Sequence, residues 1–176
     1  MAYNSRFDTP VTSVLKKAGW YEGRKIDMSE HLKIFESLGI DVFDKAKEFI
    51  QEFDGLKIPA TDFRFDENNK NHFHYFDVMH DIKGMYDILI EKKEDCEKIL
   101  MNRNFCNERV FPVGGLHGWD LGLYITESGK LINDVRVYSN TIEEGVKNLV
   151  LHKSVGSIAD LLPITPVKST VQNEKN

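Results

Sequence analysis

Cysteine and long apolar segments are both scarce in this sequence. The two cysteines, Cys96 and Cys106, are too few for the disulfide framework of a small secreted protein, and they lack the C-x-x-C spacing of zinc or redox sites. We therefore expect both thiols to be reduced. No apolar run approaches the roughly 20 residues that cross a bilayer, and residues 1–6 lack the charged and then apolar layout of a signal peptide. These absences predict a cytoplasmic protein that does not enter a membrane.

Basic residues are also in short supply. With 23 Lys and Arg against 28 Asp and Glu, the formal net charge is −5. This balance disfavours nucleic acid as a partner, because affinity for phosphate backbones depends on Lys and Arg contacts. The acidic excess lies mainly in residues 27–67, which contain eleven acidic and five basic residues. The charge therefore favours a partner whose own surface is basic.

Core-forming residues, by contrast, are plentiful. The chain has 176 residues, of which 41% are hydrophobic and 29% are charged. This length and composition fit one globular domain, since domains typically contain about 100–200 residues. We assign the domain to residues 1–157. Residues 158–176 show little periodicity and end in polar residues, which predicts a C-terminal tail that is docked or disordered.

Three helices are predicted before residue 56. Apolar residues recur at helical spacing over 10–18 and again over 30–38, with Thr9 and Ser29 as N-caps. Glycines at positions 19 and 39 end these two helices. The third helix has the clearest pattern, a single apolar stripe that closes at Gly55. The stripe consists of Phe43, Ala46, Phe49, Ile50 and Phe53.

Alternating apolar and polar residues then predict strands. Residues 57–59 and 63–65 have the pattern of short strands, and 72–76 can pair with the strand before it as a hairpin. A long helix is expected over 79–101, and a last helix opens at a capping box that begins with Thr141 and ends with Glu144. Further strands are expected over 110–113, 119–126 and 130–138. This order predicts an α+β fold, an antiparallel β-sheet flanked by N-terminal and C-terminal helices.

The strongest enzymatic candidate is a histidine pair. On a strand, His72 and His74 would point to one face about 7 Å apart and could bind a metal, with Asp77, His80 or Asp81 as a third ligand. The alternative is that they are amphipathic residues on the solvent-exposed face of a strand. We favour this alternative, because two histidines at this spacing are common by chance. The sequence also lacks G-x-S-x-G, H-E-x-x-H and the Gly-Lys-Ser/Thr ending of a P-loop. We therefore predict no catalytic residues, no metal site, no cofactor and no enzymatic activity.

The most informative candidate for binding is acidic. Four carboxylates recur at spacings of three or four residues on the third helix, so they share one face, nearly opposite the apolar stripe. The alternative is an ordinary solvated face, since lysines at 45 and 47 stand close by. The functional interpretation is a negative surface that steers and pairs with a basic protein. With nearby acids included, the predicted protein-binding residues are Asp41, Asp44, Glu48, Glu52, Asp54, Asp62 and Asp66.

Several short motifs follow one another between residues 11 and 151. They are Val14-Leu15-Lys16-Lys17-Ala18-Gly19-Trp20, Gly23-Arg24-Lys25-Ile26-Asp27, residues 46–53 with Gly55-Leu56, Phe76-Asp77, Phe111-Pro112-Val113-Gly114, Leu123-Tyr124-Ile125 with Gly129, and Thr141-Ile142-Glu143-Glu144-Gly145. Together they resemble the SUKH superfamily of bacterial immunity proteins, above all its subgroup numbered third. The Ala-Gly-Trp and Pro-Val-Gly signatures, in that order, are the most specific part of the resemblance.

The resemblance implies an α+β fold that serves as an antidote. Such proteins bind and neutralise polymorphic or contact-dependent bacterial toxins, often nucleases, and the producing cell keeps them in its cytoplasm. On this view an acidic face could occupy a toxin cleft that is basic because it holds phosphates. The family lacks fixed contact residues, so the resemblance carries over no binding site. The matching residues Gly19, Trp20, Gly55, Pro112 and Gly114 are expected to serve the fold.

The sequence departs from the family pattern at one turn. Val78 stands where a proline is expected after Asp77, which bears on the shape of that turn.

Two other functional hypotheses stay open. The first alternative function is a non-catalytic scaffold or regulatory module of the same fold that binds another protein. The second is a metal-dependent enzyme that uses His72 and His74.

Overall fold

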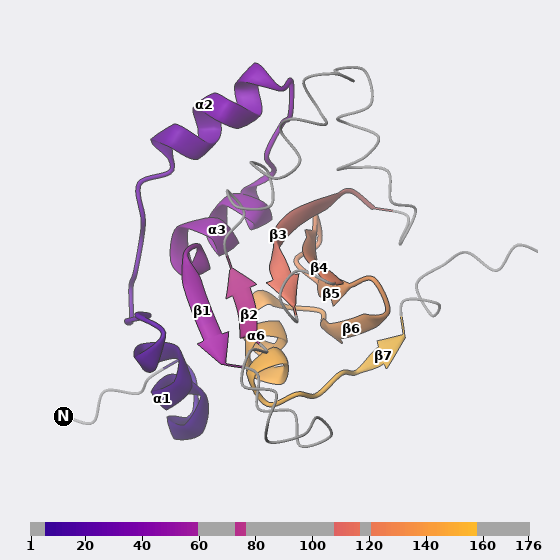
Figure 1. Cartoon of the computed structure of the whole chain (residues 1–176). Coiled ribbons are helices and arrows are strands. Elements are labelled where there is room, and N and C mark those ends of the chain that lie inside the picture. Colours follow the sequence, from indigo (N-terminus) through magenta and orange to yellow (C-terminus); the bar gives the residue numbers. More distant parts are fainter. Residues whose placement is uncertain (1–5, 60–72, 77–107, 117–120, 158–176) are drawn as a thin grey trace, which may run out of the picture.

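Seven strands form one antiparallel sheet, and helices lie against it (Figure 1). These elements belong to a computed structural model of the chain, which describes residues 6–59, 73–76, 108–116 and 121–157. Within these stretches the strands follow one another across the sheet in chain order. The architecture confirms the predicted α+β class, with an antiparallel sheet between N-terminal and C-terminal helices.

The predicted elements of the described stretches are present, with one addition and one correction. The strand predicted over 130–138 is in fact two antiparallel strands, because the chain bends at residues 134–135. The helices are α1 (Thr9–Lys17), α2 (Ser29–Ser37), α3 (Asp44–Phe53) and α6 (Ile142–Val150). The strands are β1 (Leu56–Pro59), β2 (Phe73–Phe76), β3 (Val110–Leu116), β4 (Leu121–Thr126), β5 (Leu131–Asn133), β6 (Arg136–Ser139) and β7 (Gly156–Ser157). The addition is β7, which is too short to produce a pattern in the sequence.

The first two helices begin within one residue of the predicted positions, but with different caps. Asp8 rather than Thr9 caps α1, because its side chain accepts a hydrogen bond from the N–H of Val11 at 3.2 Å. Ser29 is the first residue of α2, and its own N–H donates to the side chain of Asp27 at 2.9 Å. Both predicted caps were therefore wrong by one residue. At α1 a neighbouring short polar residue takes the cap, whereas at α2 the N-cap is Met28, which makes no side-chain cap hydrogen bond.

Half of the predicted capping box at α6 is formed. The side chain of Thr141 accepts a hydrogen bond from the N–H of Glu144 at 3.3 Å, as predicted. The N–H of Thr141 donates instead to the hydroxyl of Ser139, and the carboxylate of Glu144 pairs with Lys147. The predicted helix stops all have positive φ angles, at Gly19, Gly39 and Gly55.

Close approach of two strands explains the glycine at position 114. Strands β1 and β2 form an antiparallel hairpin, and β2 then meets β3 where Tyr75 lies opposite Gly115. A β-carbon on Gly114 would come within 1.9 Å of the backbone oxygen of Tyr75, so a side chain there would force the strands apart. The register between β3 and β4 also shifts between Pro112 and Gly114. Gly114 therefore lies at a β-bulge and serves the fold, as expected.

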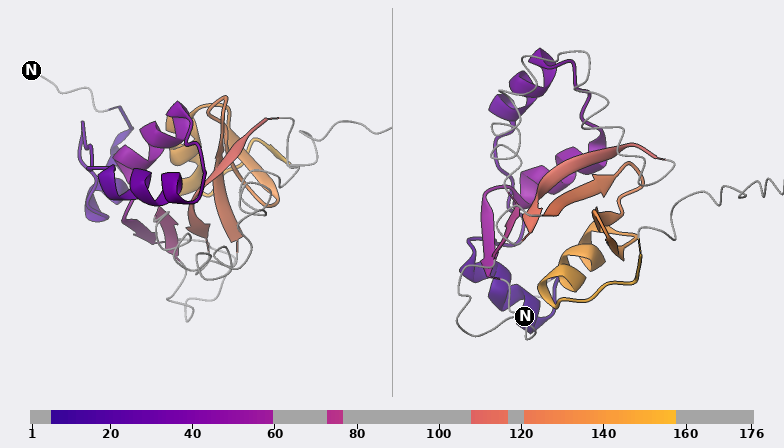
Figure 2. Two further views of the ribbon diagram at one scale, coloured as in Figure 1. Left: turned by 90° about the horizontal axis from the view of Figure 1, so that it is seen from above. Right: turned by 45° about the vertical axis from the view of Figure 1, so that its right-hand side comes forward.

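Helices α3 and α6 cover the same face of the sheet (Figure 2). The buried stripe of α3 packs there against β-strand residues, and α6 continues the layer over β5 and β6. Aromatic rings make much of the contact, with Phe49 meeting Phe76 at 5.4 Å and Phe35 of α2 meeting Phe111 at 5.1 Å between ring centroids. The main cluster includes Ala46, Phe49, Ile50, Phe53, Leu123, Ile125, Leu131, Val146 and Leu149. The predicted apolar stripe is thus confirmed as the centre of the core.

The other face of the sheet is also buried at its centre. Val110, Tyr124, Ile132 and Val137 form a second, smaller cluster. Since side chains alternate between the faces of a strand, they point away from neighbours that pack under the helices, such as Ile125. The central strands therefore carry apolar residues on both faces.

A charged contact holds the turn between β4 and β5. The carboxylate of Glu108 accepts hydrogen bonds from the ammonium of Lys130 and from the N–H of Ser128. Burial raises the pKa of Glu108, but these hydrogen bonds outweigh burial, so its pKa is lowered from the ordinary value. The turn is thereby fixed beside α3, where Gly129 approaches the side chain of Lys45.

Several predicted features lie outside the described residues. They are the strand over 63–65, the helix over 79–101, both cysteines and the tail over 158–176. The domain boundary at residue 157 stays a prediction. Of the helices that are described, none combines the length and the apolar character needed to cross a bilayer.

Loss of the Trp20 side chain should destabilise this fold strongly. Trp20 is 2% exposed, and its ring meets Phe7 edge-on at 5.4 Å. Trp20→Ala should lower the free energy of unfolding by about 3–5 kcal/mol, because it leaves a cavity in the core. Urea denaturation measures this change. Tyr21→Ala is the matched control, since Tyr21 is 57% exposed, and its effect should stay within about 0.5 kcal/mol. Equal stability of the two variants would contradict the burial of Trp20.

Candidate functional site

Helix α3 has one side in the core and the other in solvent. Asp44 and Glu48 are one turn apart and fall on the side away from the buried Phe53. Lys45 and Lys47 stand on either flank of this line. We call the exposed side chains Asp44, Lys45, Lys47 and Glu48 the α3 ridge.

Both carboxylates of the α3 ridge have a lysine partner one turn away. Glu48 pairs with Lys45 at 2.6 Å, and Asp44 pairs with Lys47 at 3.7 Å. All four side chains are at least 40% exposed. Exposed pairs of this kind contribute about 0–1 kcal/mol, because water screens them and the side chains lose freedom. The lysines therefore balance the local charge without holding the carboxylates firmly.

Asp41 lies just before α3 and belongs to a second charged group. Its carboxylate pairs with the guanidinium of Arg109 at 3.1 Å, and its backbone oxygen accepts a hydrogen bond from the same group. Arg109 also lies over the ring of Phe43 and pairs with Glu127 at 3.5 Å. Asp41 is therefore exposed but shares its cation with another carboxylate.

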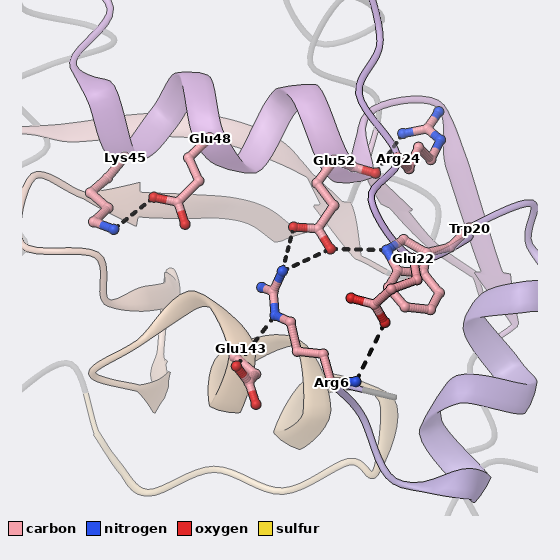
Figure 3. Close-up of polar contacts among 8 residues, drawn as sticks. All are labelled: Arg6, Trp20, Glu22, Arg24, Lys45, Glu48, Glu52 and Glu143. Atoms are coloured by element: carbon pink, nitrogen blue, oxygen red, sulfur yellow. Dashed lines mark hydrogen bonds and ion pairs between the residues drawn. The ribbon is translucent and has the colours of Figure 1, made fainter. Parts of the chain in front are cut away.

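Glu52 has the spacing of the ridge residues but a different role (Figure 3). Its carboxylate accepts two hydrogen bonds from Arg6, at 2.8 and 3.0 Å, and one from the indole N–H of Trp20 at 3.0 Å. Only 12% of the Glu52 side chain is exposed. This carboxylate therefore links α3 to the residues on both sides of α1.

Arg6 extends the same cluster to α6. Its Nε donates to the carboxylate of Glu143 at 3.3 Å, and its backbone N–H donates to Glu22 at 3.4 Å. Burial lowers the pKa of Arg6, but the hydrogen bonds and charges of Glu52 and Glu143 outweigh burial and raise that pKa above its ordinary value. Arg6 thus stays charged while it bridges α3 and α6.

The C-terminal end of α3 is also tied down from a distance. The guanidinium of Arg24 donates to the backbone oxygens of Glu52 and Asp54, at 2.6 and 2.8 Å. These carbonyls lack partners within the helix, and a cation is favourable at that end. The side chain of Asp54 lies 3.2 Å from the Nε2 of His31, and both side chains are nearly buried. Asp54 therefore takes part in packing α2 against α3.

Two surface hollows flank the α3 ridge. The first, which we call the α2–α3 hollow, has a volume of about 400 Å³. Lys47 of the ridge lines it together with Leu32, Phe35, Glu36, Gly39, Ile40, Asp41 and Val42. The second, the α3–α6 hollow, has a volume of about 350 Å³, and Lys45 and Glu48 line it on the ridge side. Arg6, Asn140 and Glu143 line the α3–α6 hollow on its other side. The ridge is thus the shared wall between two concave surfaces.

The structure describes only some of the other residues that were predicted as site residues. Among the described residues, no group of three or more His, Cys, Asp or Glu side chains could hold a metal ion. His74 lies in β2 opposite Ile58, but only its backbone belongs to the described part. The other members of the predicted metal and acidic sets lie outside the described residues: Asp62, Asp66, His72, Asp77, His80 and Asp81.

Sequence reasoning missed the partners of Glu52. A buried indole N–H needs an acceptor, so burial of Trp20 indicated that some partner exists. Nothing in the spacing of residues pointed to Glu52, which is 32 positions from Trp20 and 46 positions from Arg6. The helical pattern grouped Glu52 with Asp44 and Glu48, whose side chains are much more exposed.

Glu52 and Glu48 should differ sharply in their effect on stability. Glu52→Ala should lower the free energy of unfolding by about 2 kcal/mol, because it leaves the buried indole N–H and Arg6 without their acceptor. Glu48→Ala should change it by less than about 0.5 kcal/mol, since its pair with Lys45 is exposed. Urea denaturation of both variants checks the difference. Glu52→Gln keeps an acceptor oxygen and should fall between them, whereas equal stability of the two alanine variants would refute the role of Glu52.

The motifs and the fold agree with a comparison to known protein families. Residues 7–152 match the family described as SUKH-3 immunity protein. Comparisons with curated proteins and with solved structures found no match. The matched stretch includes all four described helices and every described strand except β7. Since it covers most of the 176 residues, the chain belongs to the SUKH-3 immunity protein family.

Proposed function

We propose that this protein binds a cognate bacterial toxin and neutralises it by direct contact, without catalysis. The observation that carries the proposal is membership of the SUKH-3 immunity protein family. An immunity protein protects the cell that makes a toxin, and blocking the toxin requires a stable complex. The partner is therefore a toxin protein rather than a nucleic acid or a membrane, and the complex forms in the cytoplasm of the producing cell.

The α3 ridge and Asp41 are the proposed contact surface. The side chains of Asp41, Asp44 and Glu48 are 80%, 103% and 49% exposed, so a partner can reach their carboxylates. Among the predicted contact residues, Asp62 and Asp66 remain part of the proposal. The side chains of Glu52 and Asp54 contribute to the same region through the fold, because their contacts position α3.

Exchange of ion pairs makes this surface suitable for a basic partner. The lysines of the α3 ridge are exposed and flexible, so they can move aside when a cation of the toxin approaches Asp44 or Glu48. The cost is small, because each exposed pair contributes about 0–1 kcal/mol. In the complex, water is excluded and the new pairs are stronger. Carboxylates with exchangeable partners can therefore contribute to binding although the ridge has little net charge.

The shape of the region supports the same surface. A ridge between two hollows gives a partner both convex and concave features to complement. A stable protein interface buries about 800 Å² on each partner. The ridge with both hollows provides a continuous surface from α2 to the start of α6 on which such an interface can form.

Co-expression with a toxin tests the proposed function. The toxin encoded beside this gene should stop growth of a sensitive host when it is expressed alone. Growth should return when this chain is expressed with it, and the two proteins should leave a gel-filtration column together. Equal killing with and without this chain would refute the immunity proposal. A pull-down from the producing bacterium, with this chain as bait, identifies the partner independently by mass.

Charge reversal on the α3 ridge should weaken the complex. Glu48→Lys should raise the Kd for the toxin at least tenfold, a loss of about 1.4 kcal/mol, and should flatten the dependence of Kd on salt. Calorimetry at several salt concentrations measures both effects. Glu144→Lys is the matched control, because Glu144 is 52% exposed, pairs with a lysine three residues on and lines neither hollow. An equal loss of affinity in both variants would place the interface away from the ridge.

A further inference from the structure

The α2–α3 hollow has an apolar floor. Phe35, Ile40 and Val42 line it, and each is at most 5% exposed. Leu32 of α2 lines it as well and is 40% exposed, which makes it one of the few large apolar side chains on the described surface. A side chain that enters the hollow would therefore contact apolar side chains.

Charged groups are added to this apolar lining. Glu36 and Asp41 contribute carboxylates, and Lys47 contributes an ammonium. Asp41 is shared with Arg109, and Lys47 lies 3.7 Å from Asp44. Within the described stretches, no ion pair involves Glu36. Among the described residues, the lining therefore has an excess of one negative charge, and Glu36 is the carboxylate most available to a partner.

Helix α2 stands at the edge of the molecule in the views of Figures 1 and 2. It buries only His31 and Phe35 of its own nine residues. Its remaining side chains add little to the core, and Leu32 and Glu36 are one turn apart on the side that lines the hollow. These two residues are free to serve contact with a partner rather than the fold.

We propose that the α2–α3 hollow receives an arginine side chain of the toxin. This inference rests on the proposed function and names the chemistry of one contact. The methylene stem of the arginine packs on Leu32 and the apolar floor, and the guanidinium donates to the carboxylate of Glu36. Arginine joins an apolar stem to a planar group with several donors, which matches both parts of the lining.

Other occupants fit the lining less well. An aliphatic or aromatic side chain would cover Glu36 without pairing it, and burying an unpaired carboxylate is costly. An anion would be repelled by Glu36 and Asp41. Lysine supplies charge, but its compact and strongly hydrated ammonium lacks the two parallel N–H donors with which a guanidinium matches both oxygens of a carboxylate. Charge and shape together therefore select arginine.

A titration with a short peptide tests the proposal on the whole chain without any toxin. The probe is acetyl-Gly-Arg-Gly-amide, and the comparison peptide carries citrulline, which has the same shape and no charge. Nitrogen-15 NMR spectra should show the arginine peptide shifting the amide signals of Leu32, Glu36, Gly39 and Asp41 in a saturable way. The citrulline peptide should cause little change at these positions. Equal shifts with both peptides, or no shift at these amides, would overturn the proposal.

Two variants with the same change in charge sharpen the test. Glu36→Gln should weaken the apparent affinity for the arginine peptide about twofold to fivefold, the range that exposed ion pairs support. Glu30→Gln should leave it unchanged, because Glu30 lies roughly 120° away around α2 and does not line the hollow. Identical affinities in both variants would refute the role of Glu36. Since the titration needs no toxin, its failure leaves the immunity proposal standing, and failure of toxin protection leaves the peptide result unaffected.

Discussion

One nearly buried carboxylate, that of Glu52, connects helix α3 to helices α1 and α6. Glu52 accepts hydrogen bonds from Arg6, which precedes α1, and from Trp20, which follows it, so one side chain ties both ends of α1 to α3. Arg6 then reaches Glu143 and extends the link to α6. A nearly buried ion pair is costly to break, because its removal leaves a partner desolvated without its acceptor. Since α3 forms a wall of both surface hollows, this internal contact also sets the shape of the surface that we propose binds the toxin.

Features that depend on neighbouring residues could be predicted from the sequence. The apolar stripe of α3 and the alternating strands follow from helical or two-residue spacing, so the α+β fold was predictable. The partners of Glu52 were not, because they lie far away in the chain and spacing alone grouped Glu52 with Glu48. The N-cap of α1 shifted from Thr9 to Asp8 for a different reason, since adjacent polar side chains satisfy the same backbone donors nearly equally. Strand β7 has only two residues and leaves no periodic signal.

Local charge and net charge have different consequences in this protein. The chain has a net charge of −5, yet each carboxylate of the α3 ridge has a lysine beside it. Steering of a basic partner therefore comes from the whole chain, whereas contact at the ridge depends on pairs that can exchange. These pairs differ from the cluster at Glu52 in their exposure to solvent. The Glu52 side chain is only 12% exposed, and replacing its partner Arg6 by a cation of another protein would disrupt the fold. Residues with the same chemistry and the same helical spacing thus have different roles, since Glu52 stabilises the fold whereas Asp44 and Glu48 belong to the surface that we propose for binding.

Specificity for one toxin requires more than exchangeable charge. In the proposed complex, the exchangeable pairs of the ridge would accept any basic surface, so they would not choose among partners. The α2–α3 hollow adds a penalty for the wrong partner, because a side chain that fills it without pairing Glu36 leaves a carboxylate desolvated. The apolar floor adds a second condition for binding, because the partner side chain must also have a hydrocarbon stem that packs against it. In the complex that we propose, discrimination would therefore belong to the hollow and exchangeable charged contact to the ridge. Because α3 forms part of both, the contact at Glu52 that links α3 to α1 would support both properties.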